Sequence, residues 1–124
     1  MAHDHPTVLL IDDNPDVRVA MREWLRLDGY RVADAWNGRD ALEQLSGGLH
    51  PCVILMDLNM PVMNGFEFRQ EQLRRPDISH IPIVVYSGVV DATKNAAHLK
   101  AAAYGTKPLD FQQLTGLVRQ HCLK

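Results

Sequence analysis

The sequence has no long hydrophobic run, no excess of charge of either sign and only two cysteines. No uninterrupted apolar stretch approaches the roughly 20 residues that a membrane-spanning helix needs. The formal net charge of −2 gives the chain no overall field that would attract nucleic acid or an anionic membrane. These absences argue against a membrane protein and against direct binding of nucleic acid.

The two cysteines and the start of the chain bear on where the protein works. Cys52 and Cys122 are isolated, with no Cys-x-x-Cys motif, and both sit in apolar runs, which predicts two buried free thiols. The first residues, MAHDHP, have neither a basic segment nor an apolar one, so we expect no secretory signal and a flexible tail over residues 1–6. Together these features predict a cytoplasmic protein.

The remaining composition is that of one soluble globular domain. The chain has 124 residues, of which 46% are hydrophobic and 23% charged. We find no repeat, no low-complexity linker and no second domain, so residues 1–124 are expected to form a single domain. The sequence to Lys124 holds no segment that we expect to be an effector domain, so a stand-alone domain and a piece of a longer protein stay open as alternatives.

Short apolar runs predict the strands. With a partly alternating stretch at 30–35 and a short candidate at 103–108, they give five strand candidates: residues 7–12, 30–35, 52–57, 81–87 and 103–108. Most are apolar at successive positions, so both faces of each strand are expected to be buried. Such strands are typical of a parallel sheet with helices on both sides.

Helical patterns separate these strands. Asn14-Pro15 predicts a helix start, with Asn as the N-cap and Pro at the first helical position. The apolar positions expected to face the core from this helix are Val17, Ala20, Met21, Trp24 and Leu25. Further helices are expected around 41–45, over 65–75 with Phe66, Phe68 and Leu73 as candidates for burial, over 92–103, and after an Asp110–Gln113 cap.

About five strands alternate with about five helices, which predicts an open, doubly wound α/β domain with a five-stranded parallel sheet. Ligands of such folds bind at the carboxyl ends of the strands. Five polar side chains end strand-like runs and would meet at that edge: Asp12, Asp13, Asp57, Ser87 and Lys107.

The acidic members of this group predict a metal site. Carboxylates about 4 Å apart repel by on the order of 4 kcal/mol per pair at an effective dielectric of 20, and a divalent cation offsets that repulsion. Oxygen ligands on a few carboxylates suit Mg²⁺. The expected ligands are Asp13 and Asp57 directly, the backbone carbonyl of Asn59, and Asp12 through water.

The same edge predicts phosphoryl chemistry. A cation and Lys107 beside one carboxylate form a site for a dianion such as a phosphoryl group, and Ser87 can donate a hydrogen bond to it. The carboxylate of Asp57 can itself attack phosphorus to give an acyl phosphate, with the positive charges stabilising the transferring group.

Over essentially its whole length, the chain resembles the receiver (response-regulator) domains of two-component signalling, the CheY-like superfamily. The matching motifs are LLIDDN with the acidic pair 12–13, MDLNMPVMNG with Asp57 as the phosphoacceptor, Ser87-Gly88, Lys107-Pro108, and Tyr104 as the switch aromatic. Each motif alone is common, but all of them occur in order and each strand-end motif follows an apolar run.

The resemblance implies a flavodoxin-like sheet of strand order 2-1-3-4-5 and a mechanism. A histidine kinase or histidine phosphotransfer protein gives its phosphoryl group to Asp57, Ser87 moves toward it, and Tyr104 turns inward. The face around the fourth helix and fifth strand then changes its affinity for a downstream protein partner. Such a domain is not an enzyme acting on other substrates, and its Lys107-Pro108 bond is expected to be cis.

Three positions depart from the family pattern. Cys52 and Lys100 stand where many members carry aspartate and glycine, and the interval from Ser87 to Lys107 is shorter than usual. Because neither strand can lose residues without moving its site residue, we expect a fourth helix that is short, late or displaced.

Two other functions fit parts of the pattern. Phosphatases of the haloacid dehalogenase type also use a strand-end aspartate, but their second acid lies two residues on, where this chain has Asn59. A receiver fold that works as a phosphorylation-independent interaction module is the stronger alternative. The presence of every site residue type favours phosphorylation.

Overall fold

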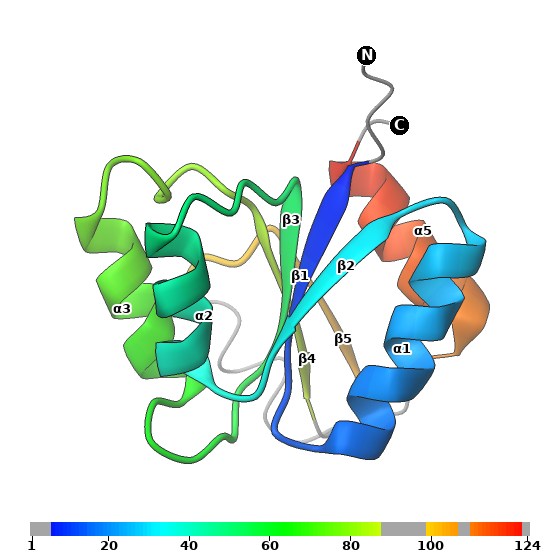
Figure 1. The fold of residues 1–124 in the computed structure, drawn as a ribbon, viewed down its shortest axis with the longest axis horizontal. Helices are drawn as coiled ribbons and strands as arrows, with labels where there is room; N and C mark the ends of the chain where they lie inside the picture. Colours follow the sequence, from blue (N-terminus) through cyan, green and yellow to red (C-terminus); the bar gives the residue numbers. More distant parts are fainter. Residues whose placement is uncertain (1–5, 88–98, 107–109, 123–124) are drawn as a thin grey trace.

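A computed structural model describes residues 6–87, 99–106 and 110–122; of Ser87 and Thr106, it describes the backbone alone. The chain forms a parallel sheet of strand order β2-β1-β3-β4-β5 (Figure 1), which confirms the predicted architecture. The strands are β1 Thr7–Ile11, β2 Arg31–Ala35, β3 Val53–Asp57, β4 Ile83–Ser87 and β5 Ala103–Thr106.

The helices cover both faces of this sheet. They are α1 Pro15–Leu27, α2 Gly38–Ser46, α3 Gly65–Arg74 and α5 Phe111–His121. Figure 1 shows α1 and α5 on one face and α2 and α3 on the other. Most of the helix expected over 92–103 and the Lys107-Pro108 bond lie outside the described residues. Within the described part of the chain, no helix is both long enough and apolar enough to cross a bilayer.

The first helix begins where the sequence predicts, with Asn14 as its N-cap. Of the five apolar positions predicted to face the core, however, one does not. Met21 and Leu25 are buried, and Val17 and Trp24 pack partly buried against the same cluster. Ala20, however, is exposed. A stripe of five positions was too wide for the contact that the helix makes with the sheet.

The burial predicted for Leu73 in α3 is also wrong, because its side chain is 50% exposed. Phe68 is fully buried, and Leu73 lies five residues later, roughly 140° further around the helix. The inward position one turn after Phe68 belongs to Gln72, which is also fully buried. Its amide donates to the carbonyls of Ile78 and Ile81 at 2.9 and 3.0 Å, so the polar group is satisfied inside the core.

The prediction of two free thiols is wrong, because Cys52 and Cys122 form a disulfide with their Cα atoms 5.3 Å apart. Cys52 directly precedes β3 and Cys122 directly follows α5, which packs on that side of the sheet. The two residues are 70 positions apart in the chain, and only the fold brings them together. The thiol argument for a reducing compartment therefore no longer applies.

The backbone explains why glycine suits the position of Lys100. Lys100 has φ +55°, in the left-handed region that side chains disfavour. Arg69 on α3 holds this turn by donating to the carbonyls of Leu99 and Lys100 at 2.9 and 3.0 Å. The chain therefore keeps the turn that a glycine would favour and carries a lysine in it.

Candidate functional site

Three carboxylates meet at the carboxyl edge of the sheet. β1 and β3 are parallel neighbours with Ile11 opposite Met56, so the next residues, Asp12 and Asp57, emerge side by side. Asp13 follows directly. One carboxylate oxygen from each of the three aspartates lies within 4.8 Å of the others. The structure thus brings together the acidic cluster that the sequence placed at this edge.

Asp12 is fully buried and accepts hydrogen bonds at both of its carboxylate oxygens. Its Oδ1 accepts the backbone N–H of Asn14 at 2.9 Å, and its Oδ2 accepts the hydroxyl of Tyr86 at 2.7 Å. The guanidinium of Arg18 donates to its backbone carbonyl. The sequence analysis did not identify Tyr86 as part of the site. Alternation along the strand does place the side chains of Val84 and Tyr86 on the same face of the sheet.

Tyr86 is a hydrogen-bond donor in this cluster. Its side chain is 1% exposed. Burial raises the pKa of Tyr86 well above 10, and the charge and hydrogen bond of Asp12 raise it further. The phenol therefore keeps its proton and places a donor among three carboxylates.

Asp57 ends β3 and is 5% exposed. Its Oδ1 accepts the backbone N–H of Leu58 at 2.7 Å and, more weakly, that of Asn59 at 3.5 Å. Asn59 is exposed in the turn that follows the strand. The backbone that follows β3 therefore orients the carboxylate of Asp57. The turn that carries Asn59, whose carbonyl is the predicted ligand, begins directly after Asp57.

Gly65 closes this turn from the far side. Its N–H donates to the carbonyl of Leu58 at 2.9 Å. A Cβ at this position would lie 2.9 Å from the carbonyl oxygen of Asp57 and 3.0 Å from the Cα of Leu58. Because both contacts are with backbone, only glycine fits here without moving the segment that carries Asp57.

Replacing Gly65 by alanine should therefore cost about 1–3 kcal/mol of unfolding free energy and lower the affinity for Mg²⁺. Chemical denaturation and calorimetry measure the two effects. Gly116→Ala in α5 is the matched control, since its Cβ would meet nothing within 4 Å. That control should gain about 1 kcal/mol from helix propensity and bind Mg²⁺ as the wild type does. Equal behaviour of the two variants would contradict the packing argument.

The other predicted site residues are placed less completely. Ser87 ends β4, one residue beyond Tyr86, which is paired with Asp57. The backbone of Ser87 therefore lies at the same edge of the sheet as Asp57. The structure does not describe its side chain. Lys107 lies outside the described residues. Tyr104 lies on β5 with 48% of its side chain exposed.

The donor set fits Mg²⁺. The three clustered side chains offer carboxylate oxygens, and Mg²⁺ prefers oxygen ligands and keeps several waters. Asp13 is exposed and Asp57 borders it, so both can contribute oxygens directly. Both oxygens of Asp12 already accept hydrogen bonds from the chain, which suits the predicted contact through water.

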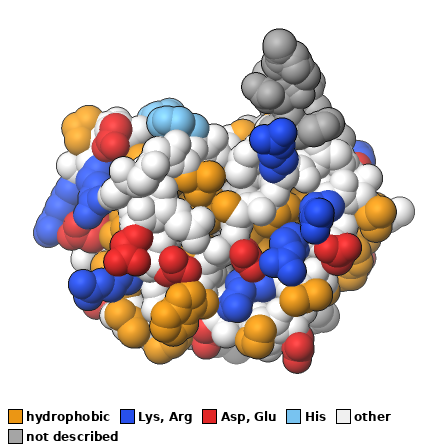
Figure 2. Space-filling model, viewed as in Figure 1, with side chains coloured by type: hydrophobic (Ala, Val, Ile, Leu, Met, Phe, Trp, Pro, Cys, Tyr) orange, Lys and Arg blue, Asp and Glu red, His pale blue; other side chains and the backbone are white. Residues whose placement is uncertain are grey.

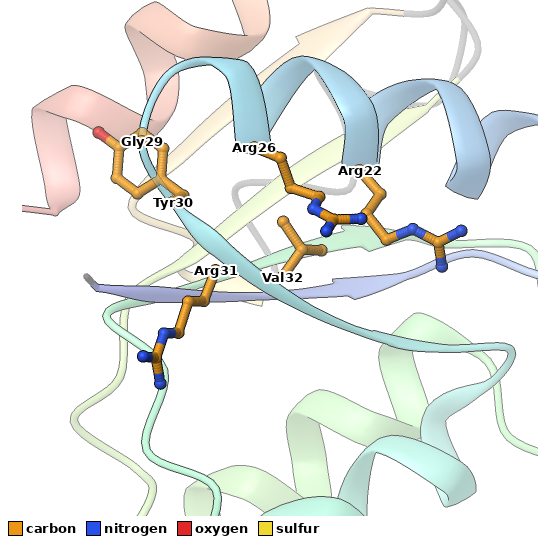
Figure 3. A pocket seen from close by; sticks show the side chains of 6 residues that line it. All are labelled: Arg22, Arg26, Gly29, Tyr30, Arg31 and Val32. Atoms are coloured by element: carbon orange, nitrogen blue, oxygen red, sulfur yellow. The ribbon is translucent and has the colours of Figure 1, made fainter. Parts of the chain in front are cut away.

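A separate cavity of about 650 Å³ lies between α1 and the start of β2 (Figure 3). It is lined by Arg22, Arg26, Gly29, Tyr30, Arg31 and Val32. Figure 3 shows Arg22 and Arg26 extending from α1 near Val32, whereas Arg31 points away from them. Arg22 also pairs with Asp34 at 3.1 Å. The guanidinium groups do not converge on one point, so we assign this cavity no ligand.

Charge on the visible surface is mixed. Figure 2 shows basic and acidic side chains interspersed over α1, β2, α2 and α3. On this face, the basic side chains do not form a continuous positive patch of the kind that binds nucleic acid, and the acidic side chains form no continuous patch either.

Comparisons with known proteins agree with this geometry. The sequence profile described as "Response regulator receiver domain" matches residues 8–119. The chain is 34% identical to the sensor histidine kinase TmoS of Ectopseudomonas mendocina over 117 residues, which cover 93% of this chain and 12% of TmoS. It is 34% identical to the transcriptional regulatory protein PrrA of Mycobacterium tuberculosis over 116 residues, which cover 92% of this chain and 48% of PrrA.

A solved structure shows the same architecture. The chemotaxis protein CheY4 of Vibrio cholerae superposes with a TM-score of 0.87 at 27% identity, covering 96% of this chain and all of that one. This chain therefore spans about half of PrrA, a small part of TmoS and the full length of CheY4.

Proposed function

The chain belongs to the response regulator receiver domain family, and we propose that its Asp57 accepts a phosphoryl group from a phosphohistidine on a partner protein. The observation that carries the proposal is the cluster of Asp12, Asp13 and Asp57 at the carboxyl edge of the sheet. Such a cluster costs energy unless a cation occupies it, and its central carboxylate ends a buried strand.

In the transfer step, a carboxylate oxygen of Asp57 attacks the phosphorus atom of the donor. An O–P bond forms, the P–N bond to the donor imidazole breaks, and its electron pair stays on the imidazole nitrogen. The product is an aspartyl phosphate. The N–H of Leu58 holds one oxygen of Asp57 and so orients the carboxylate for attack. The rest of the step needs positive charge around the transferred group.

Asp13, Asp57 and the carbonyl of Asn59 would hold Mg²⁺ directly, and Asp12 would do so through water. When bound, the ion supplies positive charge beside the phosphoryl oxygens. We assign Lys107 as the second positive group, paired with the phosphoryl, and Ser87 as its hydrogen-bond donor.

The donor would be a histidine kinase or a histidine phosphotransfer protein, and the output would be a change in affinity for a downstream protein. The relatives support a signalling role, since TmoS is a sensor histidine kinase and PrrA a transcriptional regulatory protein. Tyr104 is our candidate for the side chain that reports phosphorylation, and its half-exposed position leaves it accessible to a partner. We propose a cytoplasmic location, where such kinases present their phosphohistidine; the Cys52–Cys122 disulfide must then persist against the reductants of that compartment.

Incubation with acetyl phosphate and Mg²⁺, followed by intact mass measurement, tests the proposal. We expect a gain of one phosphoryl group, which disappears with EDTA and in Asp57→Asn. The asparagine amide keeps the shape of the side chain but lacks the negative charge that makes a carboxylate oxygen a nucleophile. An unmodified wild-type protein would instead favour the phosphorylation-independent interaction module.

A further inference from the structure

The strand register places Tyr86 beside the acidic cluster. It pairs with Asp57 across β3 and β4, and with Gly105 across β4 and β5. Asp12 continues β1 beside Asp57, as the register of the two strands requires. Asp12, Asp57 and Tyr86 therefore belong to one row across the carboxyl end of the sheet. Alternation along β3 and β4 puts the last two on the face that α1 and α5 cover, with Leu55 and Val84.

The hydroxyl of Tyr86 reaches past Asp57, its neighbour on β3, to Asp12. β4 and β1 are separated by β3, and adjacent strands lie about 4.8 Å apart. To donate to Asp12 at 2.7 Å, the phenol must span β3 on the face from which Asp57 projects. On the other neighbouring strand, β5, the residue paired with Tyr86 is Gly105, which has no side chain to pack against the ring. The phenol therefore lies beside the carboxylate cluster, with its hydroxyl on Asp12.

We propose that Tyr86 is a positioning residue for the metal site, whose hydroxyl holds Asp12 in the orientation that Mg²⁺ binding requires. The inference rests on the proposed function, because that function supplies the metal. Asp12 is held at both oxygens, by Tyr86 and by the N–H of Asn14, so its carboxylate cannot rotate without losing a buried hydrogen bond. Outer-shell groups of a metal site typically matter tenfold or more for affinity, and Asp12, which would contact the ion through water, is such a group and is held by Tyr86.

Packing alone does not explain a tyrosine at this position. The ring lies in an apolar cluster with Leu10, Leu55 and Val84, where phenylalanine would bury the same surface. Burying a hydroxyl costs free energy unless it finds a partner. The partner here is a carboxylate of the cluster itself, so the hydroxyl acts on the site and not on the core.

Calorimetric titration of Tyr86→Phe with MgCl₂ and with CaCl₂ tests this role. The variant keeps the ring and the core and removes one O–H. We expect the Mg²⁺ affinity to fall about tenfold. The Ca²⁺ affinity should change less than about threefold, because Ca²⁺ tolerates irregular coordination whereas Mg²⁺ demands near-octahedral geometry. A purely structural tyrosine would not change this selectivity.

Tyr30→Phe is the matched control, since Tyr30 is a second buried tyrosine of the same core cluster but precedes the amino end of β2. It should bind both ions as the wild type does. In an Asp12→Asn background, Tyr86→Phe should have no further effect on Mg²⁺ affinity.

The outcomes separate the two proposals. If the wild type binds Mg²⁺ and Tyr86→Phe binds it equally tightly, or loses both ions in proportion, the role of Tyr86 is refuted and the metal site stands. If the wild type binds no Mg²⁺, the metal site itself is refuted, and the role of Tyr86 with it.

Discussion

Replacing Asp13 by alanine should lower the affinity for Mg²⁺ on the order of a hundredfold. Asp13 is the exposed member of the cluster, and its oxygen lies within 4.8 Å of those of Asp12 and Asp57. Its removal takes away a direct ligand and one of the three charges that attract the cation. Of the other two acids, Asp12 already has both oxygens in hydrogen bonds with the chain, so it is poorly placed to compensate. Calorimetry on the purified protein measures the affinity.

Asp16→Ala provides the matched control for Asp13→Ala. Asp16 is an exposed carboxylate in the first turn of α1, three residues along the chain, and its loss changes the net charge by the same amount. We expect its Mg²⁺ affinity to stay within about threefold of the wild type, since exposed charges act weakly through water. Equal losses in the two variants would mean that Asp13 acts only through the overall field and is not a ligand.

Reducing the Cys52–Cys122 disulfide should lower the free energy of unfolding by about 2–4 kcal/mol. The bond closes a loop of 70 positions, so it removes many conformations from the unfolded chain. It also ties the start of β3, the strand that carries Asp57, to the end of α5. Urea denaturation with and without a reductant measures the difference.

A double variant, Cys52→Ala with Cys122→Ala, controls for effects of the reductant itself. Its stability should resemble that of the reduced wild type and should not respond to the reductant. Thiol titration of the unfolded, unreduced wild type should find no free thiol, as the structure has no free cysteine among its described residues. Two free thiols, together with unchanged stability on reduction, would contradict the paired arrangement.

The sequence predicted the sheet and the acidic cluster because both depend on local patterns. The apolar run 53–56 marks a strand buried on both faces, and the carboxylate that ends it must lie at the sheet edge. The same reasoning applies to Asp12 after β1. The residues that end a strand or cap a helix lie within a few positions of one another, so their pattern is visible in the sequence.

Features that depend on tertiary contact were not predictable in the same way. The hydrogen bond from Tyr86 to Asp12 and the disulfide join residues 74 and 70 positions apart. Nothing in the local pattern distinguishes Tyr86 from an apolar strand residue. The exposure of Leu73 follows from Gln72 occupying the inward position with satisfied hydrogen bonds, which a hydrophobic pattern does not anticipate.

The most direct test of the central claim is to identify the residue that carries the phosphoryl group. Borohydride reduces an aspartyl phosphate at its carbonyl carbon to the alcohol, which converts that aspartate into homoserine. After treatment of the protein with acetyl phosphate, Mg²⁺ and then borohydride, peptide mass spectrometry should find homoserine at position 57 alone. Homoserine at position 12 or 13, or none at all in a protein that has gained phosphoryl mass, would contradict the assignment of Asp57.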